Sequence, residues 1–296
     1  MENSPLIPLL ITFIAGLSTL IGAALTFIIK RNDVKMLALG MSFSAGVMIY
    51  LCFMDVLPLS INYTLKDSTE LFKGKGAEIL CAIMFFVGVF FAGIIDWLIP
   101  EHIDSDMVGA RSKNGICNCK EHGADYSACT ECLKNGTKKR IKPQCRSVAR
   151  AGLITAITLG IHNFPEGLSV FTTSLTDINV GLAVAFAVML HNIPEGISVA
   201  LPIYNVTGSK SKAFLISALS GMAEPLGAIV AWLFLAPILT PALLGALLAF
   251  TAGIMIYISL DELLPMAKEY GHEHYGIIGV FAGMALMAVS SIIFSH

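Results

Sequence analysis

Charged residues are scarce in this sequence. Asp, Glu, Lys and Arg make up 14% of its 296 residues, whereas a soluble domain has about a quarter. Hydrophobic residues make up 55% and the formal net charge is −2, so the chain lacks the basic surface that nucleic-acid phosphates require. These shortages exclude a water-soluble globule, a disordered chain and a nucleic-acid-binding protein. The exception is residues 101–150, which hold 16 of the 40 charged side chains and five of the seven cysteines.

Long apolar runs predict an all-α polytopic membrane protein. A helix needs about 20 apolar residues to cross a bilayer, and these runs do not alternate as the strands of a membrane β-barrel do. The eight expected transmembrane helices cover residues 6–29, 36–58, 77–99, 148–172, 179–203, 212–235, 242–266 and 275–295. We therefore expect helices 1–3 within residues 1–100, a polar Cys-rich loop at 101–147 and helices 4–8 within 148–296.

The distribution of basic residues predicts the orientation, because cytoplasmic loops collect Lys and Arg. With the N-terminus outside, 16 of the 19 basic residues lie on the inside, ten of them from Arg111 to Arg150. The sequence therefore predicts a multi-pass protein of the cell (plasma or inner) membrane. Both termini are expected outside and the 101–147 loop in the cytoplasm.

An internal repeat suggests how the helices are arranged. Residues 44–58 (SAGVMIYLCFMDVLP) and 251–265 (TAGIMIYISLDELLP) are identical at seven of 15 positions. The first copy lies in a helix expected to run outward and the second in one expected to run inward, which is typical of inverted-topology transporters. Gly88 to Gly93 and Gly279 to Gly283 extend the repeat weakly. The pattern favours a 3 + 2 + 3 arrangement, with chance similarity between apolar helices as the alternative.

A second repeat carries the chemistry. The hexapeptide His162–Gly167 (HNFPEG) in helix 4 matches His191–Gly196 (HNIPEG) in helix 5 at five of six positions. Within the first copy, His162 and Glu166 are four residues apart and share one helix face. Because consecutive spans are antiparallel, we expect the two motifs to face each other near the middle of the membrane.

These side chains point to a cation. If both histidines, both motif glutamates and Glu224 of helix 6 faced lipid, the insertion cost would be about 12–17 kcal/mol. Imidazole suits zinc and other transition metals, and carboxylate and amide oxygens extend the range toward Mn²⁺ and Fe²⁺. The candidate metal ligands are His162, Asn163, Glu166, His191, Asn192, Glu195 and Glu224. A polar network that only holds the helices together is the alternative.

The paired motifs resemble those of the ZIP (Zrt-, Irt-like) metal-transporter family, and most closely its bacterial ZupT-type branch. The resemblance covers essentially all of the predicted spans. It implies eight spans, outside termini, a 3 + 2 + 3 inverted repeat and an elevator-like motion of one helix bundle against another. It also implies movement of Zn²⁺, and often Fe²⁺, Mn²⁺, Co²⁺ or Cd²⁺, into the cytoplasm through a binuclear site on helices 4, 5 and 6.

Carried over residue by residue, the resemblance implies two adjacent metal positions bridged by the motif glutamates. One uses His162, Glu166, His191 and Glu195, and the other uses Asn163, Glu166, Asn192, Glu195 and Glu224. Met48 of helix 2 is a further candidate ligand, with core packing as its alternative role. The resemblance implies no catalytic cofactor, because the metal ion is the transported species.

Two further groups are candidates for handling metal. The loop contains Cys117, Cys119, Cys129 and Cys132, whose close spacing allows a tetrahedral zinc site, with free thiols as the alternative. Asp55 and Glu262 occupy equivalent positions of the first repeat. They are candidates for ion access, ion exit or proton coupling, with solvated helix ends as the alternative.

A divalent-metal uptake transporter is the favoured function, with membrane lipid and metal ions as its partners. An intramembrane zinc-dependent enzyme is a second hypothesis; it would retain one metal and carry no ion flux, and the His-Glu-x-x-His string of zinc proteases is absent. A membrane metal sensor is a third, and it would depend on residues 105–145 rather than on Glu166. Ion preference and oligomeric state stay open, a homodimer included.

Overall fold

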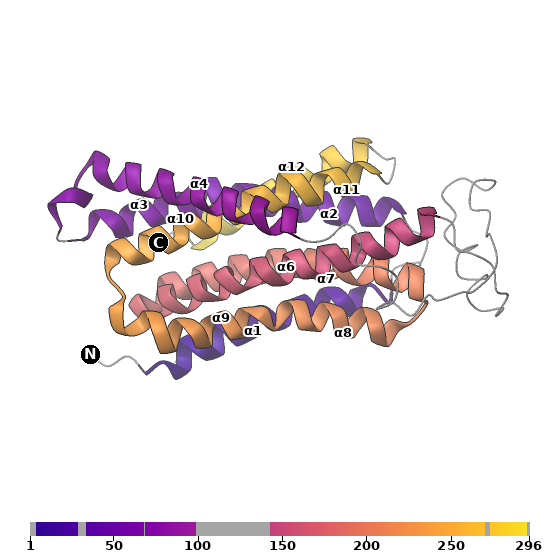
Figure 1. The fold of residues 1–296 in the computed structure, drawn as a ribbon, viewed down its shortest axis with the longest axis horizontal. Coiled ribbons are helices and arrows are strands. Elements are labelled where there is room, and N and C mark those ends of the chain that lie inside the picture. The colour runs from indigo at the N-terminus through magenta and orange to yellow at the C-terminus, as the bar shows by residue number, and fades with distance from the viewer. Residues whose placement is uncertain (1–3, 29–33, 68, 99–142, 270–272, 295–296) are drawn as a thin grey trace.

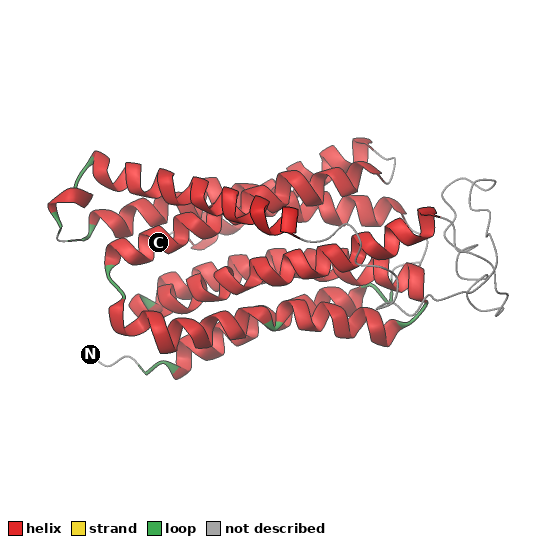
Figure 2. Cartoon of the chain, viewed as in Figure 1, coloured by secondary structure: helices red, strands yellow, loops and turns green. Residues whose placement is uncertain are grey.

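The structure is a computed structural model that describes residues 4–28, 34–67, 69–98, 143–269 and 273–294. Most of the expected 101–147 loop lies outside these residues, together with the candidate ligands Cys117, Cys119, Cys129 and Cys132. All the regular structure of the described chain is helical, with loops and turns between the helices and no strand (Figure 2). This agrees with the predicted all-α class.

The helices follow the predicted spans in order. The elements are α1 (Leu6–Leu25), α2 (Val34–Tyr50), η1 (Leu51–Val56), α3 (Leu57–Leu65), η2 (Glu70–Phe72), α4 (Lys75–Leu98), α6 (Pro143–Thr176), α7 (Ile178–Thr207), α8 (Lys210–Gly221), α9 (Ala223–Val230), η3 (Ala231–Leu235), η4 (Ala236–Ile238), α10 (Pro241–Ile258), η5 (Ser259–Leu263), α11 (Leu264–Glu269) and α12 (Glu273–Phe294). Helix α6 begins at Pro143, five residues inside the segment expected to be loop.

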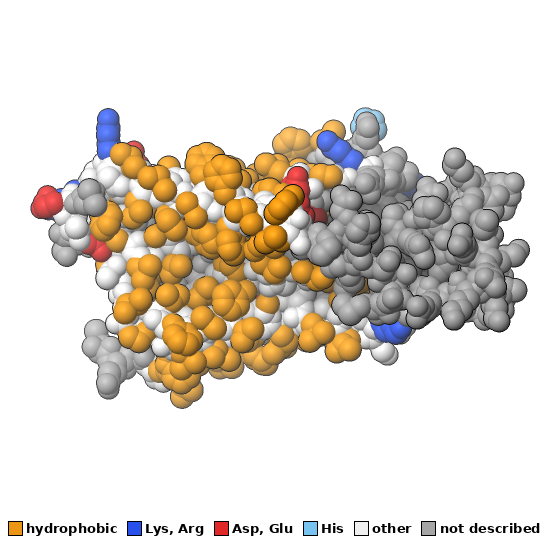
Figure 3. All heavy atoms as spheres, viewed as in Figure 1, with side chains coloured by type: hydrophobic (Ala, Val, Ile, Leu, Met, Phe, Trp, Pro, Cys, Tyr) orange, Lys and Arg blue, Asp and Glu red, His pale blue; other side chains and the backbone are white. Residues whose placement is uncertain are grey.

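Seven helical stretches of the described chain are long and apolar enough to cross a membrane. They correspond to predicted helices 1–3 and 5–8, and the predicted fourth span falls within the 34-residue helix α6. Hydrophobic side chains cover the middle of the molecule and charged ones lie toward its ends (Figure 3). The described chain is therefore a polytopic membrane protein.

Helices α6 and α7 pack against each other between two groups of helices (Figure 1). On one side, α1 packs along α7, and α9 packs along α6. On the other side, α2 contacts α7 and α10 contacts α6, while α12 and α4 pack on α2 and α10 from outside. This arrangement places both hexapeptide motifs at the centre of the bundle.

Three π-helical turns precede prolines. Helix α3 follows η1 and helix α11 follows η5, whereas η3 leads only into the short 3-10 helix η4. Each of η1, η3 and η5 ends two residues before a proline, namely Pro58, Pro237 and Pro265. In η1, for example, the Leu57 N–H donates to the Cys52 carbonyl five residues back. Proline lacks an N–H and its ring crowds the carbonyl four residues before it, so a wider turn at that point lets the helix continue.

Glycines allow the helices to pack with their backbones nearly in contact. A Cβ atom added at Gly46 of α2 would lie 2.1 Å from the Val280 carbonyl oxygen of α12. One added at Gly253 of α10 would lie 2.0 Å from the Phe85 carbonyl oxygen of α4. Such small-residue contacts are the usual basis of helix association in membranes, where dispersion contacts replace the hydrophobic effect.

We expect Gly46→Ala to destabilise the protein by about 1–3 kcal/mol, because the new methyl group must push two backbones apart. The matched control is Gly276→Ala in α12, where an added Cβ meets no atom within 4 Å. Thermal denaturation in detergent should show a lower transition temperature for Gly46→Ala and an unchanged or slightly higher one for Gly276→Ala. Equal stability of the two variants would contradict this packing.

Candidate metal centre

The two hexapeptide motifs present their polar side chains to each other across the α6–α7 interface. His162, Asn163 and Glu166 of α6 are at most 2% exposed, and the matching residues of α7 are at most 1% exposed. Both helices run on without a break through the proline of their motif. The i, i+4 spacing therefore keeps each histidine and glutamate on one face of a continuous helix.

Four of these side chains converge. His191 Nε2 lies 2.8 Å from Glu166 Oε1, and His162 Nε2 lies 3.7 Å from Glu166 Oε2 and 3.8 Å from Glu195 Oε1. Candidate ligand atoms of His162, His191 and Glu195 all lie within 4.8 Å of one another. Ligands of a tetrahedral zinc ion sit about 2.0–2.2 Å from the metal, so a small inward movement would let these atoms share one ion.

The asparagines link this cluster to helices α1, α8 and α9. Asn192 Nδ2 donates hydrogen bonds to Glu224 Oε1 and to the Ala15 carbonyl oxygen, the latter at 3.1 Å. Asn163 Nδ2 donates to the Ser220 carbonyl oxygen at 3.2 Å. These hydrogen bonds use the amide nitrogen of each asparagine. The amide oxygen of each asparagine accepts none of them and is available to a cation.

Many polar atoms of the cluster lack hydrogen-bond partners within the described part of the chain. They are both ring nitrogens of His162, the side-chain oxygens of Asn163 and Asn192, both carboxylate oxygens of Glu195, and Oε2 of Glu166 and Glu224. Buried polar atoms are nearly always paired in native proteins, and buried charges are paired or bound to metals. The cluster therefore has the chemistry of a divalent-cation site.

The sequence places no Lys or Arg near these carboxylates along α6 and α7. Between Arg150 and Lys210, which spans the motifs of α6 and all of α7, there is no Lys or Arg. Glu224 also interacts electrostatically with Glu166 and Glu195. Nitrogen and oxygen donors in one buried cluster suit Zn²⁺ and its first-row neighbours.

Comparison with known proteins agrees with this geometry. A family model described as "ZIP Zinc transporter" matches residues 5–291. The chain belongs to the ZIP family. It is 44% identical to the zinc transporter ZupT of Campylobacter jejuni, over 96% of this chain and 95% of that protein. It is 46% identical to the ZupT of Chlorobium phaeovibrioides and 43% identical to that of Streptococcus mutans, each over at least 95% of both chains.

Two other predicted features of this ZIP chain have neighbours outside the two motifs. Met48 is fully buried in an apolar cluster with Cys52, and its sulfur lies 4.0 Å from Ser44 Oγ. Asp55 accepts hydrogen bonds from Ser291 at 2.8 and 3.0 Å. A ligand role for Met48 stays a prediction.

One contact beside the motifs was not predicted from the sequence. Ser169 Oγ lies 3.1 Å from Thr251 Oγ1, and both hydroxyls also reach the Pro165 carbonyl oxygen. These bonds tie α6 to α10 one turn beyond Glu166. The available signal was that Ser169 lies seven residues after His162, on the same face of the helix.

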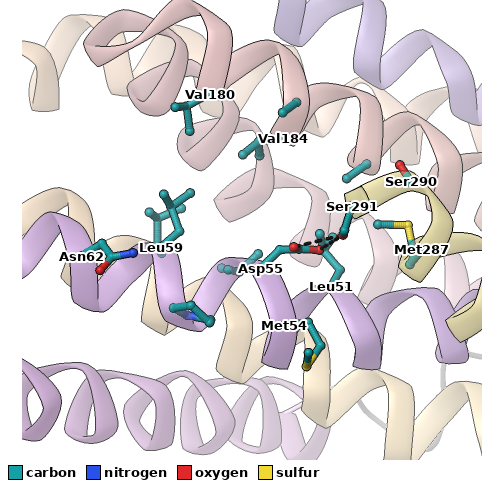
Figure 4. Close-up of a pocket in the computed structure, with 15 residues that line it drawn as sticks. Leu51, Met54, Asp55, Leu59, Asn62, Val180, Val184, Met287, Ser290 and Ser291 are labelled. Carbon is teal, nitrogen blue, oxygen red and sulfur yellow. Dashed lines mark hydrogen bonds between the residues drawn. The ribbon is translucent and has the colours of Figure 1, made fainter. Parts of the chain in front are cut away.

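A pocket of about 270 Å³ lies between α7 and the segment formed by η1 and α3. Figure 4 shows Asp55 and Ser291 on one wall and Val180 and Val184 on the other. On α7, Val180, Val184, Ala187 and His191 follow one another at spacings of four, three and four residues, so they share a face. The pocket therefore lies along the face of α7 that leads to His191.

We expect Glu166→Gln to weaken Zn²⁺ binding by the purified protein by about tenfold or more. Replacing even a residue that only hydrogen-bonds to a metal ligand typically lowers metal affinity by about this factor. Glu166 is the carboxylate that lies beside both imidazoles. The matched control is Glu78→Gln, at an exposed position in the first turn of α4. Isothermal titration calorimetry in detergent measures both affinities, and equal values would refute the site.

Proposed function

We propose that this chain is a transporter that takes up divalent metal cations, Zn²⁺ among them, into the cytoplasm, and that it is not an enzyme. The observation that carries the proposal is the buried convergence of His162, Glu166, His191 and Glu195 between α6 and α7. The relatives' description as zinc transporters supports it. Fe²⁺, Mn²⁺, Co²⁺ and Cd²⁺ are further expected cargo, because the donor set is mixed nitrogen and oxygen.

The site is proposed to hold two metal ions. His162, Glu166, His191 and Glu195 form the first position, and Asn163, Glu166, Asn192, Glu195 and Glu224 form the second. The hydrogen bond from Asn192 to Glu224 supports the second position, because it brings the α9 carboxylate to the edge of the first cluster. Glu166 and Glu195 then bridge the two ions.

The bundle is proposed to have eight spans in a 3 + 2 + 3 inverted repeat, with α6 as the fourth span. Matching contacts support this arrangement. Gly46 and Gly253 occupy the same position of the first repeat, and each packs against a carbonyl oxygen of another helix, Val280 for Gly46 and Phe85 for Gly253. The π-helical turns η1 and η5 also fall at matching positions.

The same contacts favour a different register for the weaker part of the repeat. Gly88 meets the Phe250 carbonyl oxygen and Gly283 meets that of Phe43. Phe43 and Phe250 are 207 residues apart, which is the offset between the two copies of the first repeat. Gly88 is therefore proposed to correspond to Gly283, rather than to Gly279 as sequence similarity suggested.

The pocket beside Asp55 is proposed to be the route by which metal reaches the site from outside. With both termini outside, η1, α3 and the beginning of α7 lie in the outer half of the membrane. A second pocket of about 390 Å³ continues outward and shares Leu59, Asn62 and Val180 with the first. A carboxylate in such a passage attracts cations and raises their local concentration.

We expect His162→Ala and Glu195→Ala to lower ⁶⁵Zn²⁺ uptake into proteoliposomes by about tenfold or more, because each removes a proposed metal ligand. The matched control is His274→Ala, at an exposed position beyond the site. Absence of flux through the wild-type protein would favour the zinc-enzyme hypothesis. Loss of function on deleting residues 105–145, with Glu166→Ala active, would favour the sensor hypothesis.

We expect Asp55→Asn to raise the KM for Zn²⁺ uptake severalfold while the maximal rate changes less, because the substitution removes attraction and leaves the site intact. Asparagine keeps the shape of the side chain and one oxygen that can accept from Ser291, so the main change is the loss of charge. Glu70→Gln, at an exposed carboxylate outside both pockets, is the control. An unchanged KM for Asp55→Asn would place the route elsewhere.

A further inference from the structure

A large apolar groove lies on the opposite side of α6 from the paired side chains. It has a volume of about 830 Å³ and is lined by residues of α4, α6, α8, α9 and α10. Phe91, Phe164, Leu219 and Phe250 contribute to its walls, and Ser220 is the only polar side chain among the lining residues. The groove takes its lining from the middle of these helices, far from the charged ends of the molecule.

The mouth of the groove opens onto the apolar outer surface. Phe91 is 41% exposed, Leu226 is 55% exposed and Leu219 is 65% exposed. Each of these residues both lines the groove and forms part of the surface that faces hydrocarbon in a membrane protein. The medium next to the mouth is therefore lipid tails and not water.

The groove must be filled by something apolar. Water does not occupy cavities without several polar partners, and here only one side chain offers any. An empty space of this size is also unfavourable, because its lining loses dispersion contacts in proportion to its volume. A flexible hydrocarbon chain from the adjoining bilayer meets both conditions.

We infer that the groove binds one acyl chain of a membrane phospholipid, inserted between α6 with α8 and α9 on one side and α4 with α10 on the other. The inference goes beyond the proposed transport function and does not depend on metal binding. The acyl chain would pack against Phe164 and Pro165, two residues of the first hexapeptide motif that face away from the paired side chains. It would also contact Ser220, whose carbonyl oxygen holds the amide of Asn163.

The position of Ser220 gives the groove a direct connection to the metal centre. Its hydroxyl is buried and has no hydrogen-bond partner among the described residues. A chain that fills the space beside it holds the α8 backbone, and with it Asn163, in place. Ser220 therefore contacts an occupant of the groove and, through its backbone carbonyl, the candidate metal ligand Asn163.

Photolabelling tests the inference directly. The protein is reconstituted in phosphatidylglycerol vesicles that contain a phospholipid with a diazirine on its acyl chain, irradiated and digested. Mass spectrometry then maps the adducts. We expect them to be enriched on residues 156–168 and 216–226 relative to the exposed face of α12. Labelling that merely follows exposed apolar area would overturn the inference, and cross-links between two chains at the groove would assign it to a second copy instead.

Gly160→Leu provides the matched variant. A Cβ at Gly160 meets Ser220 at 3.7 Å, an ordinary contact, so a larger side chain is accommodated on the groove wall. Groove adducts should fall by about fivefold or more, because the leucine occupies space that chain methylenes would fill. Ala285→Leu, on the exposed face of α12, should leave them unchanged.

A second variant keeps the test decisive. If Gly160→Leu does not elute as a single folded species, Ile216→Phe fills the groove from the α8 side. Undiminished groove labelling in a folded filling variant would refute the acyl-chain site. Loss of Zn²⁺ uptake without loss of lipid labelling, as expected for His162→Ala, would separate this inference from the transport function.

Discussion

Carboxylates buried in the middle of a membrane protein need positive charge nearby, because hydrocarbon cannot solvate them. Here Glu166, Glu195 and Glu224 are buried together, and the sequence between Arg150 and Lys210 contains no Lys or Arg. The two histidines stabilise part of this negative charge through their contacts with Glu166 and Glu195. The remaining negative charge supports the proposal that the centre of the bundle binds a cation, and the packing of the surrounding helices keeps these groups together.

The hexapeptide motif combines ligand and packing roles in adjacent residues. Glu166 points into the cluster, while a Cβ on Gly167 would lie 2.1 Å from the Glu224 carbonyl oxygen of α9. Glu195 and Gly196 repeat this toward α1, where a Cβ would lie 2.0 Å from the Thr19 carbonyl oxygen. Successive residues of a helix point about 100° apart, so one residue reaches the metal and the next admits a neighbouring backbone.

Hydropathy and helical spacing were sufficient to predict the helix order and the clustering of the motif side chains, because both depend on local periodicity. The end of the second span was harder to predict: it was expected near Pro58, but the π-helical turn η1 carries the helix on to Leu65. The hydrogen-bond partners of the polar side chains on other helices could not be predicted from the sequence either. That Asn192 bonds to Glu224, and that Ser169 meets Thr251, depends on how separate helices are rotated against each other.

The proposed inverted repeat also explains why the proposed second metal position lies on one side of the first. Asn163 donates a hydrogen bond to the backbone of Ser220 on α8, and Asn192 donates one to the backbone of Ala15 on α1. The two acceptor residues, Ser220 and Ala15, are 205 positions apart in the sequence. The same offset relates Glu224 to Thr19, so a carboxylate on α9 corresponds to a hydroxyl on α1. A hydroxyl brings no negative charge, so the proposed second cation would be stabilised toward α9 rather than toward α1. These two hydrogen bonds are related by the repeat while the charge beside them is not, because Glu224 and Thr19 differ at matching positions.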